Sequence, residues 1–590
     1  MNFFKRFIAS FFAVIAAFWF MGIVLILILV AIGSADGTPS VANGSVLKIS
    51  LNRPIVDYKG GSGDDPFSVL FEETTALDEV VASVNAAAKD DRISGISLET
   101  PFFFGGWGQA ETLRNALIGF KNSGKFIYAY GDSYSQKSFY LSSVADSLFV
   151  TPTGFVDLRG LSSELTYYKS FQEKSGLRME VIRHGKYKAA VEPYLNDAPS
   201  IENTEQIQEL IDGLWDVVGS QMANQKEVSR ADFEGWVNDL VTNNLEKATS
   251  LGVIGGLVYE DQYEESLKRA VGASENDLKA SSKLNKISTT SYHKTIESVQ
   301  VDTSDRIALV YAQGSILYGE GSPTIMGQET MNKALKSARE DRNVKAVVMR
   351  INSPGGSALT SDLIWREVEK TAKEKPVVVS ISDVAASGGY YIAAPATYII
   401  AQPTSITGSI GVFGTLPNAS ELAEDWGISS YTLSTHERSA TYSPLRPLSD
   451  SFRAELTQGI EQTYQTFLER VASGRSMSID EVDAIAQGRV YLASKAKEIG
   501  LVDEIGTFDD AINKAAELAE IDEFKLREYP RYKSDFERLL GDLPAAVIST
   551  LHSNLPGFIS NYLGFWETVQ EENGKYNRIQ TRLPFDLNIE

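Results

Sequence analysis

The chain has 590 residues, of which 43% are hydrophobic and 22% are charged, and its formal net charge is −22. This length favours two or more domains, and the acidic balance argues against nucleic-acid binding because no basic surplus exists to neutralise phosphates. The absence of cysteine excludes disulfides, thiolate catalysis and iron–sulfur clusters, and with four histidines and no HExxH motif we expect no metal and no other cofactor.

An apolar segment near the start predicts a membrane anchor within residues 1–40. Residues 7–33 carry no charge over 27 positions, which at about 1.5 Å per residue is enough to cross a bilayer core of about 30 Å. A cleaved signal peptide has a shorter apolar region, so an uncleaved anchor is favoured, although residues 33–35 could form a weak cleavage site. Lys5 and Arg6 precede the span, and the positive-inside rule then leaves the N-terminus in the cytoplasm. We expect contact with membrane lipid there, and everything after about residue 40 beyond the inner membrane.

The rest of the chain contains an internal repeat. AKDDRISGISLE (88–99) is echoed by REDRNVKAVVMR (339–350) at a separation of 250 residues, and pairs such as Tyr140 and Tyr391 are 251 apart. SLGVIGGL (250–257) parallels EIGLVDEI (498–505) at 248. A separation that drifts by three residues over this distance indicates a duplication with few insertions.

Each copy alternates short β-branched runs with longer amphipathic segments. In the second copy we predict strands over 306–312, 345–351, 376–382 and 397–403, and helices over 330–341 and 360–374. This alternation predicts an α/β fold with a mainly parallel sheet covered by helices. The predicted order is the anchor, a first α/β domain (45–271), a polar linker (272–304), a second α/β domain (305–525) and a C-terminal extension (526–590).

A candidate nucleophile, Ser387, lies in the second copy between two alanines and two glycines. It follows a predicted strand and precedes YYIAAPA (390–396), which can start a helix. Such a corner exposes the hydroxyl and aims the following N–H groups toward it, as an oxyanion site requires. The motif is not the GxSxG elbow of α/β-hydrolases, because Ala385 stands two residues before the serine.

A second glycine turn, in RINSPGGSALT (350–360), follows another predicted strand. Gly355 and Gly356 allow the backbone to approach a ligand closely and to turn an N–H group inward. Two donors from two loops would hold a tetrahedral oxyanion. Taken alone, however, SPGG indicates only a turn.

The repeat points to a base in the other copy. A separation of 251 places Gln136 opposite Ser387, and Lys188 of HGKYKAAVEPYLNDAP (184–199) opposite Ser439. Each copy thus has a chemical residue that the other lacks, so an enzyme using both needs one site at their junction. Lysine is a base only when neutral, and burial there could lower its pKa from about 10.4. Ser–Lys pairs are a known variant of nucleophile and base, whereas the plain alternative is a solvated lysine.

These motifs resemble a known family when they are taken together. NSPGG, DVAASGGYYIAAPA and ITGSIGVFG in the second copy, with GKYKAAVEPYL in the first, closely resemble the long, duplicated form of the signal peptide peptidase A family, also called protease IV. The resemblance covers nearly the whole chain. It implies two tandem ClpP/crotonase-like domains, with Ser387 as the nucleophile and Lys188 as the general base.

The resemblance also assigns the supporting groups of such a site. Ser409, in TGSIG, would hydrogen-bond the lysine amine, and Gly355, Gly356 and the N–H of Gly388 would form the oxyanion hole. The repeat places Leu158 opposite Ser409, so this position too is polar only in the serine-bearing copy.

What the resemblance implies beyond the site is a homotetramer, shaped as a bowl that opens toward the membrane. Its substrates would be signal peptides left in the membrane after the leader peptidase has cut them, and other short apolar peptides. No GxxxxGK[ST] loop is present, so we expect no use of ATP.

Two other functions stay open from the sequence. A crotonase-like acyl-CoA enzyme would use two backbone N–H groups but would not need both Ser387 and Lys188. A non-catalytic membrane scaffold would not react with serine-directed reagents. The sequence also leaves open whether the two residues meet within one chain or between neighbouring chains.

Overall fold

A computed structural model gives the fold of most of the chain. It describes residues 39–60, 74–274, 283–296, 302–436 and 438–532, the backbone of 580–582, and scattered positions between 5 and 21. The predicted anchor therefore lies mostly outside the described residues. Among the residues that are described, no helix is both long enough and apolar enough to cross a membrane.

The first repeat (residues 45–271) is built on a parallel sheet. Its strands are β1 (Ser45–Ile49), β4 (Ile93–Leu98), β5 (Phe126–Tyr134), β6 (Ser147–Val156), β8 (Gly256–Leu257) and β9 (Lys286–Ser288), in the spatial order β8-β6-β5-β4-β1-β9. A two-stranded pair, β2 (Ile55–Val56) and β3 (Thr75–Ala76), lies apart from it. Strand β9 comes from the segment predicted as the linker, where Lys286 pairs with Val46 of β1. The polar composition of that segment gave no indication of a strand.

The second repeat (residues 305–525) is built on a larger sheet. Its strands are β10 (Arg306–Gln313), β14 (Val344–Ser353), β16 (Val377–Ala386), β17 (Tyr398–Ala401), β18 (Ile406–Gly408), β20 (Val490–Leu492), β21 (Glu504–Ile505) and β22 (Lys525–Tyr529). The order is β20-β18-β16-β14-β10-β22, with β17 beside β16 and β21 beside β17, and only β20 runs antiparallel to its neighbour. The four strands predicted in this copy are present, and β16 extends four residues further than expected, as far as the residue before Ser387.

Helices cover these sheets in both repeats. The first repeat contains α3 (Leu77–Lys89), α4 (Trp107–Lys121), α5 (Gln136–Ser142), α6 (Lys169–Ser175), the 3-10 helix η1 (Ala189–Tyr194), α7 (Ile201–Gln225), α8 (Arg230–Asn238), η2 (Val241–Asn243), α9 (Leu245–Ser250) and α10 (Glu260–Ala270), and α12 (Thr289–His293) follows. The second contains α13 (Gln328–Glu340), α14 (Ala358–Glu374), α15 (Gly388–Ala393), α16 (Ser420–Asp425), α17 (Asp450–Arg475), α18 (Ile479–Ile485), α19 (Ala493–Glu498) and α20 (Phe508–Leu518). Ser200, Ser357 and Ser449 cap α7, α14 and α17 by accepting a backbone N–H three residues on.

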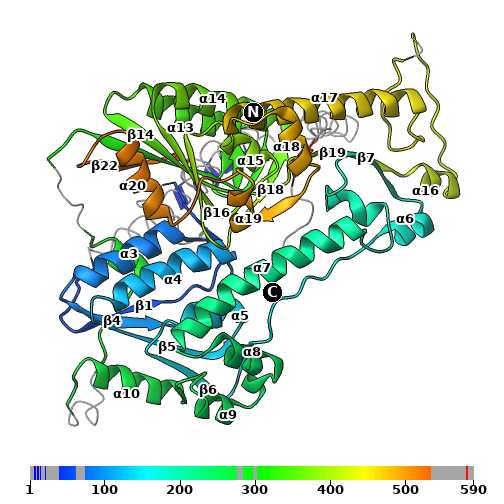
Figure 1. Cartoon of the computed structure of the whole chain (residues 1–590). Helices are drawn as coiled ribbons and strands as arrows, with labels where there is room; N and C mark the ends of the chain where they lie inside the picture. Colours follow the sequence, from blue (N-terminus) through cyan, green and yellow to red (C-terminus); the bar gives the residue numbers. More distant parts are fainter. Residues whose placement is uncertain are drawn as a thin grey trace.

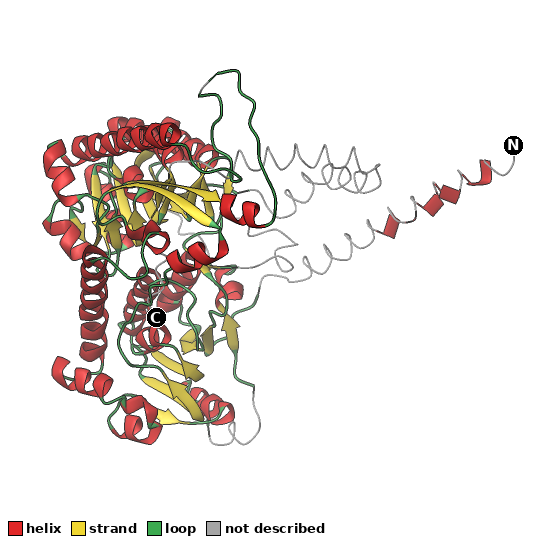
Figure 2. Ribbon diagram, turned by 90° about the vertical axis from the view of Figure 1, so that its right-hand side faces the viewer, coloured by secondary structure: helices red, strands yellow, loops and turns green. Residues whose placement is uncertain are grey.

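The two repeats pack one above the other, with α3 and α4 between their sheets (Figure 1). Helix α4 belongs to the first repeat, yet it also contacts β16 of the second. A view from the side shows helices next to the strands of both repeats, and a long loop that extends beyond them (Figure 2). Helix α4 therefore lies at the junction between the two repeats.

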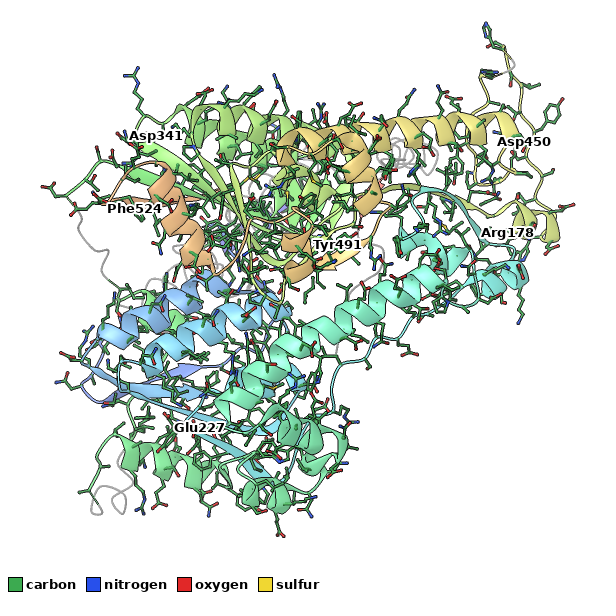
Figure 3. The ribbon with its side chains drawn as sticks, viewed as in Figure 1. Arg178, Glu227, Asp341, Asp450, Tyr491 and Phe524 are labelled. Carbon is green, nitrogen blue, oxygen red and sulfur yellow. The ribbon has the colours of Figure 1, made fainter. Side chains whose placement is uncertain are left out.

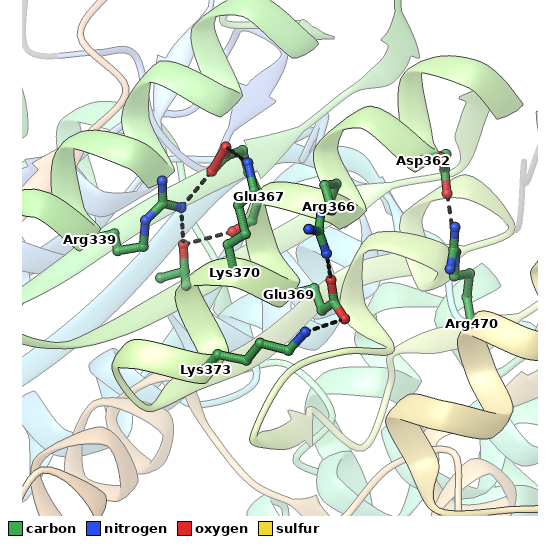
Figure 4. A network of polar contacts seen from close by, with 9 residues as sticks. Arg339, Asp362, Arg366, Glu367, Glu369, Lys370, Lys373 and Arg470 are labelled. Carbon is green, nitrogen blue, oxygen red and sulfur yellow. Dashed lines mark hydrogen bonds and ion pairs between the residues drawn. The ribbon is translucent and has the colours of Figure 1, made fainter.

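The outer surface of the second repeat carries a network of charged side chains on α13 and α14 (Figure 4). Glu369 contacts both Arg366 and, at 2.8 Å, Lys373, while Glu367 pairs with Arg339. The Glu369–Lys373 pair, between residues four apart in one helix, stabilises that helix by only about 0.3–0.5 kcal/mol. The Arg339–Glu367 pair instead joins two helices, and its side chains are only 10% and 14% exposed. The stability of this repeat therefore depends mainly on its buried apolar core.

A third, mixed sheet joins the repeats. Its strands are β7 (Arg178–His184), β11 (Ser315–Leu317), β12 (Gly321–Ser322), β13 (Ile325–Gly327), β15 (Gly355–Ser357), β19 (Val412–Asn418) and β23 (Gln580–Arg582), in the order β12-β13-β11-β15-β23-β19-β7. Strand β7 of the first repeat pairs antiparallel with β19 of the second, with His184 opposite Val412. Figure 3 places Arg178, at the start of β7, near Asp450 of α17 and far from Glu227, just after α7. Strand β7 of the first repeat thus lies against the second repeat.

Candidate active site

Ser387 lies at a strained corner between a strand and a helix. Strand β16 ends at Ala386, α15 begins at Gly388, and Ser387 between them has φ 54° and ψ −117°. Its N–H donates to the carbonyl of Gly408 at 2.8 Å. A positive φ at a residue other than glycine costs about 1–3 kcal/mol and often marks a functional position. The serine is fully buried in this single chain.

Ser409 lies beside this corner because its strand pairs with that of Ser387. Strand β18 runs parallel to β16 with Gly408 opposite Ala386, so both strands deliver the next residue at the same edge of the sheet. Ser409 also has φ 54°, and its N–H donates to the carbonyl of Arg489 at 2.6 Å. Two strained serines thus meet at one point.

Lys188 reaches this point from the first repeat through the loop after β7. The N–H of Tyr187 donates to the carbonyl of Gln487 at 2.9 Å, and Gln206 of α7 donates its side-chain amide to the carbonyl of Tyr187 at 3.1 Å. A Cβ atom at Gly488 would lie 2.6 Å from the Cβ of Lys188, so only glycine permits this close approach. The loop is therefore held by both repeats.

The structure brings Lys188, Ser387 and Ser409 together within one chain. The Nζ of Lys188 is 2.8 Å from the Oγ of Ser387, 2.9 Å from the Oγ of Ser409 and 3.0 Å from the carbonyl oxygen of Ser409. All three are hydrogen-bond distances. A neutral amine has two N–H donors and one lone pair, and this geometry supplies two acceptors on Ser409 and one hydroxyl donor on Ser387.

The electrostatics of the site favour that neutral amine. Lys188 is fully buried, and burial lowers its pKa well below its ordinary value of 10.5. Among the described residues no carboxylate forms an ion pair with it, and the ring centroid of Phe413 lies 6.0 Å from its Nζ. A lysine in such a pocket can accept a proton at a pH where a solvated lysine cannot.

The two glycine-containing segments of the predicted oxyanion hole lie close to Ser387 and Lys188. Gly388 is the first residue of α15, and β15, which begins with Gly355 and Gly356, contacts that helix. The N–H of Gly355 already donates to the Oγ of Ser353 at 3.2 Å. An oxyanion at Gly355 would therefore have to compete with that hydroxyl, whereas Gly388 lies in the first turn of α15, where backbone N–H groups have no partner within the helix.

The matching corner of the first repeat is filled by its own side chains. The amide oxygen of Gln136 accepts from the N–H groups of Arg159 and Gly160 at 3.0 and 2.9 Å, and its nitrogen donates to the carbonyl of Gly160 at 2.8 Å. Leu158, opposite Ser409 in the repeat, is buried, and Ser439, opposite Lys188, is exposed. The first repeat thus has no nucleophile at this corner.

Some neighbours of the site could not be found from the sequence. Phe413 and Gly488 contact Lys188, but more than 200 residues separate them from it and no spacing links them. His184, four residues before Lys188, instead stacks on Tyr464 at 3.8 Å between ring centroids and contacts Glu461. In the part of the chain that the structure describes, no group of three acidic or histidine side chains could hold a metal ion.

The lowered pKa of Lys188 has a consequence for stability. Between that pKa and 10.5 the unfolded chain binds a proton at Lys188 that the folded chain does not, so the free energy of unfolding rises with pH. Lys188→Met lacks this term. We expect the free energy of unfolding of the wild type, minus that of the variant, to increase by up to about 1.4 kcal/mol per pH unit in this window.

Urea unfolding at a series of pH values measures this difference. Lys186→Met, which removes an exposed lysine from the same loop, is the matched control and should show no such slope. A difference for Lys188→Met that stays constant with pH would mean that Lys188 is charged in the folded protein.

Comparison with known proteins gives the family. The model described as Peptidase family S49 matches residues 119–274 and 369–522. Protease 4 of Salmonella typhi is 31% identical over 591 residues, covering 97% of this chain and 94% of that protein. Chloroplastic serine protease SPPA of Arabidopsis thaliana is 32% identical over 526 residues, covering 86% of this chain and 74% of that protein. The structure of a ClpP1 mutant from Listeria monocytogenes matches 35% of this chain and 95% of its own at 15% identity, with a TM-score of 0.24, so a ClpP/crotonase-like fold stays a prediction. The chain belongs to peptidase family S49 and is a serine protease.

Proposed function

We propose that the protein is an endopeptidase in which Ser387 is the nucleophile and Lys188 the general base. The observation that carries the proposal is the 2.8 Å contact between the Ser387 hydroxyl and a fully buried amine with a lowered pKa. An uncharged amine can take the hydroxyl proton as the oxygen attacks a peptide carbonyl. The two N–H groups that Ser409 holds then keep the lone pair directed at Ser387.

The reaction proceeds through an acyl-enzyme. Attack by Ser387 gives a tetrahedral intermediate, whose oxyanion is stabilised by the N–H of Gly388 and by the Gly355–Gly356 turn. Lys188 returns its proton to the leaving amine, the peptide C–N bond breaks, and the acyl group remains on Ser387 as an ester. Lys188 then takes a proton from water, the resulting hydroxide attacks the ester, and the acid product leaves while Ser387 regains its proton.

The substrate class we propose is an extended, unfolded peptide, in particular a signal peptide after its release by cleavage. Strand β23 supports this binding mode, because its backbone pairs antiparallel with β15, with Thr581 opposite Gly356. A peptide substrate would pair with β15 through main-chain hydrogen bonds in the place that β23 takes in this structure. The resemblance to signal peptide peptidases provides the preference for short apolar peptides, which need no ATP to unfold them.

A crotonase-like acyl-CoA enzyme is the alternative chemistry, and a non-catalytic scaffold is the other alternative. An acyl-CoA enzyme would stabilise a thioester enolate with backbone N–H groups and would gain nothing from a serine at hydrogen-bond distance from a neutral lysine. A scaffold would gain nothing from a lysine that is costly to bury. Membership of a peptidase family also counts against both.

Labelling with a fluorophosphonate probe tests the proposed pair. Wild type is expected to be labelled at Ser387, and Ser387→Ala to abolish the label. Lys188→Met should slow labelling by about 10²–10⁴-fold, because the general base is lost, and Ser409→Ala by about 10-fold, because the amine loses a hydrogen bond. The wild-type rate should rise with pH through the lowered pKa of Lys188 and then level off.

Lys186→Met, on the exposed side of the same loop, is the control and should label like wild type. Labelling at the wild-type rate in Lys188→Met would exclude the proposed base. A wild-type protein that does not label at all would favour the scaffold.

We propose further that residues 7–33 anchor the chain in the inner membrane as a single span, with the N-terminus in the cytoplasm and both repeats on the periplasmic side. The uncharged length of this segment and the basic residues before it support the proposal. Full-length protein should then stay in the membrane fraction until detergent is added, whereas a chain beginning at residue 39 should be recovered without detergent. Recovery of both forms without detergent would contradict the anchor.

We also propose a homotetramer, supported by an exposed apolar segment of the second repeat. Ile428, Tyr431 and Leu433 are 54%, 89% and 88% exposed. Tyr431 and Leu433 lie 251 residues after Glu180 and Ile182 of β7, the strand with which the first repeat docks on the second. The same segment of the second repeat would dock on a neighbouring chain, and repetition of this contact would close a ring.

Sedimentation of the detergent-solubilised protein tests this assembly. A mass of four chains is expected for wild type, and smaller species for Leu433→Asp, because the charge would be buried in the contact. Leu251→Asp, at an exposed leucine of the first repeat, is the control and should remain tetrameric. A monomeric wild type would contradict the proposal.

A further inference from the structure

A partly buried carboxylate outside the Ser–Lys pair joins three elements of the junction. Asp383 lies on β16, four residues before Ser387, and it contacts both the first repeat and the strand that leads to the oxyanion turn. Burial, followed by the nearby charge of Asp57, raises the pKa of Asp383. A carboxylate is costly in such a place unless hydrogen bonds satisfy it, so its partners indicate what it does.

The first partner belongs to the repeat that supplies Lys188. The backbone N–H of Gln109, in the first turn of α4, donates to the Oδ1 of Asp383 at 2.9 Å. A Cβ atom at Gly106, the N-cap of that helix, would lie 2.2 Å from the carboxyl carbon, so glycine is required for the helix to approach this closely. The start of α4 therefore rests directly on Asp383.

The second partner belongs to the strand of the oxyanion turn. The side-chain amide of Asn352, near the end of β14, donates to the Oδ2 of Asp383 at 2.8 Å. The next residue, Ser353, accepts the N–H of Gly355 through its Oγ. The contact thus joins the strand of the nucleophile to the strand that leads into Gly355.

This contact lies where the backbone pairing of the two strands is interrupted. Ile351 of β14 is opposite Ile381 of β16, but Ser353 is opposite Ala385, so β16 contains two extra residues in this interval. Backbone hydrogen bonds cannot fix the relative position of the strands across such a bulge. The side chains of Asn352 and Asp383 connect them there.

The first repeat provides an internal comparison. Asp132 lies 251 residues before Asp383, and the pairing of its strand is also irregular between Gly131 and Ser133. Asp132 is exposed and accepts from the hydroxyl of Thr151. The aspartate is thus present in both repeats, but only in the repeat that carries the nucleophile is it partly buried between three elements.

We propose that Asp383 is a positioning residue for the peptidase reaction, which holds the oxyanion turn in place relative to Ser387 and joins both to the repeat that carries Lys188. The inference rests on the proposed Ser–Lys mechanism. Asp383 acts through Asn352 and Gln109 and does not touch the reacting atoms. Its removal should therefore misplace the oxyanion donors while leaving the surroundings of Lys188 unchanged.

Asp383→Ala and Asp383→Asn separate this role from a general structural one. Asp383→Ala should lower kcat by about 10- to 100-fold with little change in KM, because a displacement of about 1 Å at a reacting group has an effect of this size. Asp383→Asn should regain most of the activity. Its oxygen still accepts from Gln109, and its amide can donate to Asn352 once the Asn352 amide turns over. The pH at which the labelling rate is half maximal should be the same in all three proteins.

A double-mutant cycle locates the effect. Asn352→Ala removes the same contact from a partly buried position and should slow the reaction in the same way even if Asp383→Ala does not fold. The double variant should be no slower than the slower single variant, because both act through one contact. Glu111→Gln, at a buried carboxylate of the same junction that contacts Thr404, is the control and should keep wild-type kcat.

The outcomes distinguish this inference from the proposed mechanism. A wild type that does not react with the fluorophosphonate would refute the Ser–Lys mechanism itself. With an active wild type, a folded Asp383→Ala at full activity, an Asp383→Asn as slow as Asp383→Ala, or additive effects in the double variant would each overturn the positioning role.

Discussion

The pairing of β7 with β19 is the interaction on which the active-site geometry depends. It carries a loop of the first repeat into the second, so that Lys188 lies 2.8 Å from a serine that is 199 residues away in the sequence. The same contact removes Lys188 from water, and this burial lowers its pKa. Strand pairing therefore determines both the position and the basicity of the amine.

The duplication explains why such a contact could arise. When two similar α/β units share one active site at their junction, each unit needs to retain only its own part of that site. The first has filled its own corner with Gln136, whose amide is fully engaged with the next loop, and has kept the lysine loop. The second has kept two serines in strained backbone conformations, and helix α4 closes the junction from the other side. Neither unit contains both the serine and the lysine.

The sequence predicted the parts of the fold and site that follow from local pattern or from the repeat. The β-branched runs gave the central strands of the second repeat, and the repeat showed that Ser387 and Lys188 each lack a counterpart in the other copy. The family resemblance then paired Lys188 with Ser387. Family motifs added Ser409 and the glycines. In each case the information lies in a short segment or in one spacing.

What the sequence did not predict depends on contacts between distant segments. Strand β9 is only three residues long and polar, and it forms because the edge of β1 is open to it. Gly488 is needed because Lys188 lies directly against it, and Asp383 is partly covered because α4 of the other repeat rests on it. Nothing in the motif NSPGG indicates the hydrogen bond from the N–H of Gly355 to the hydroxyl of Ser353. Such features become visible only when the distant segments are brought together in the folded structure.

The central claim is that Lys188 is neutral in the folded protein near neutral pH. An NMR titration of the chain labelled with ¹³C at lysine Cε measures its charge directly, and Lys188→Met identifies the resonance. The account predicts that the resonance absent from the variant titrates well below 10.5, while Lys226, whose pKa burial lowers to about 8, gives a second shifted resonance that the variant keeps. If the resonance absent from the variant titrates near the ordinary lysine value, Lys188 cannot be the base.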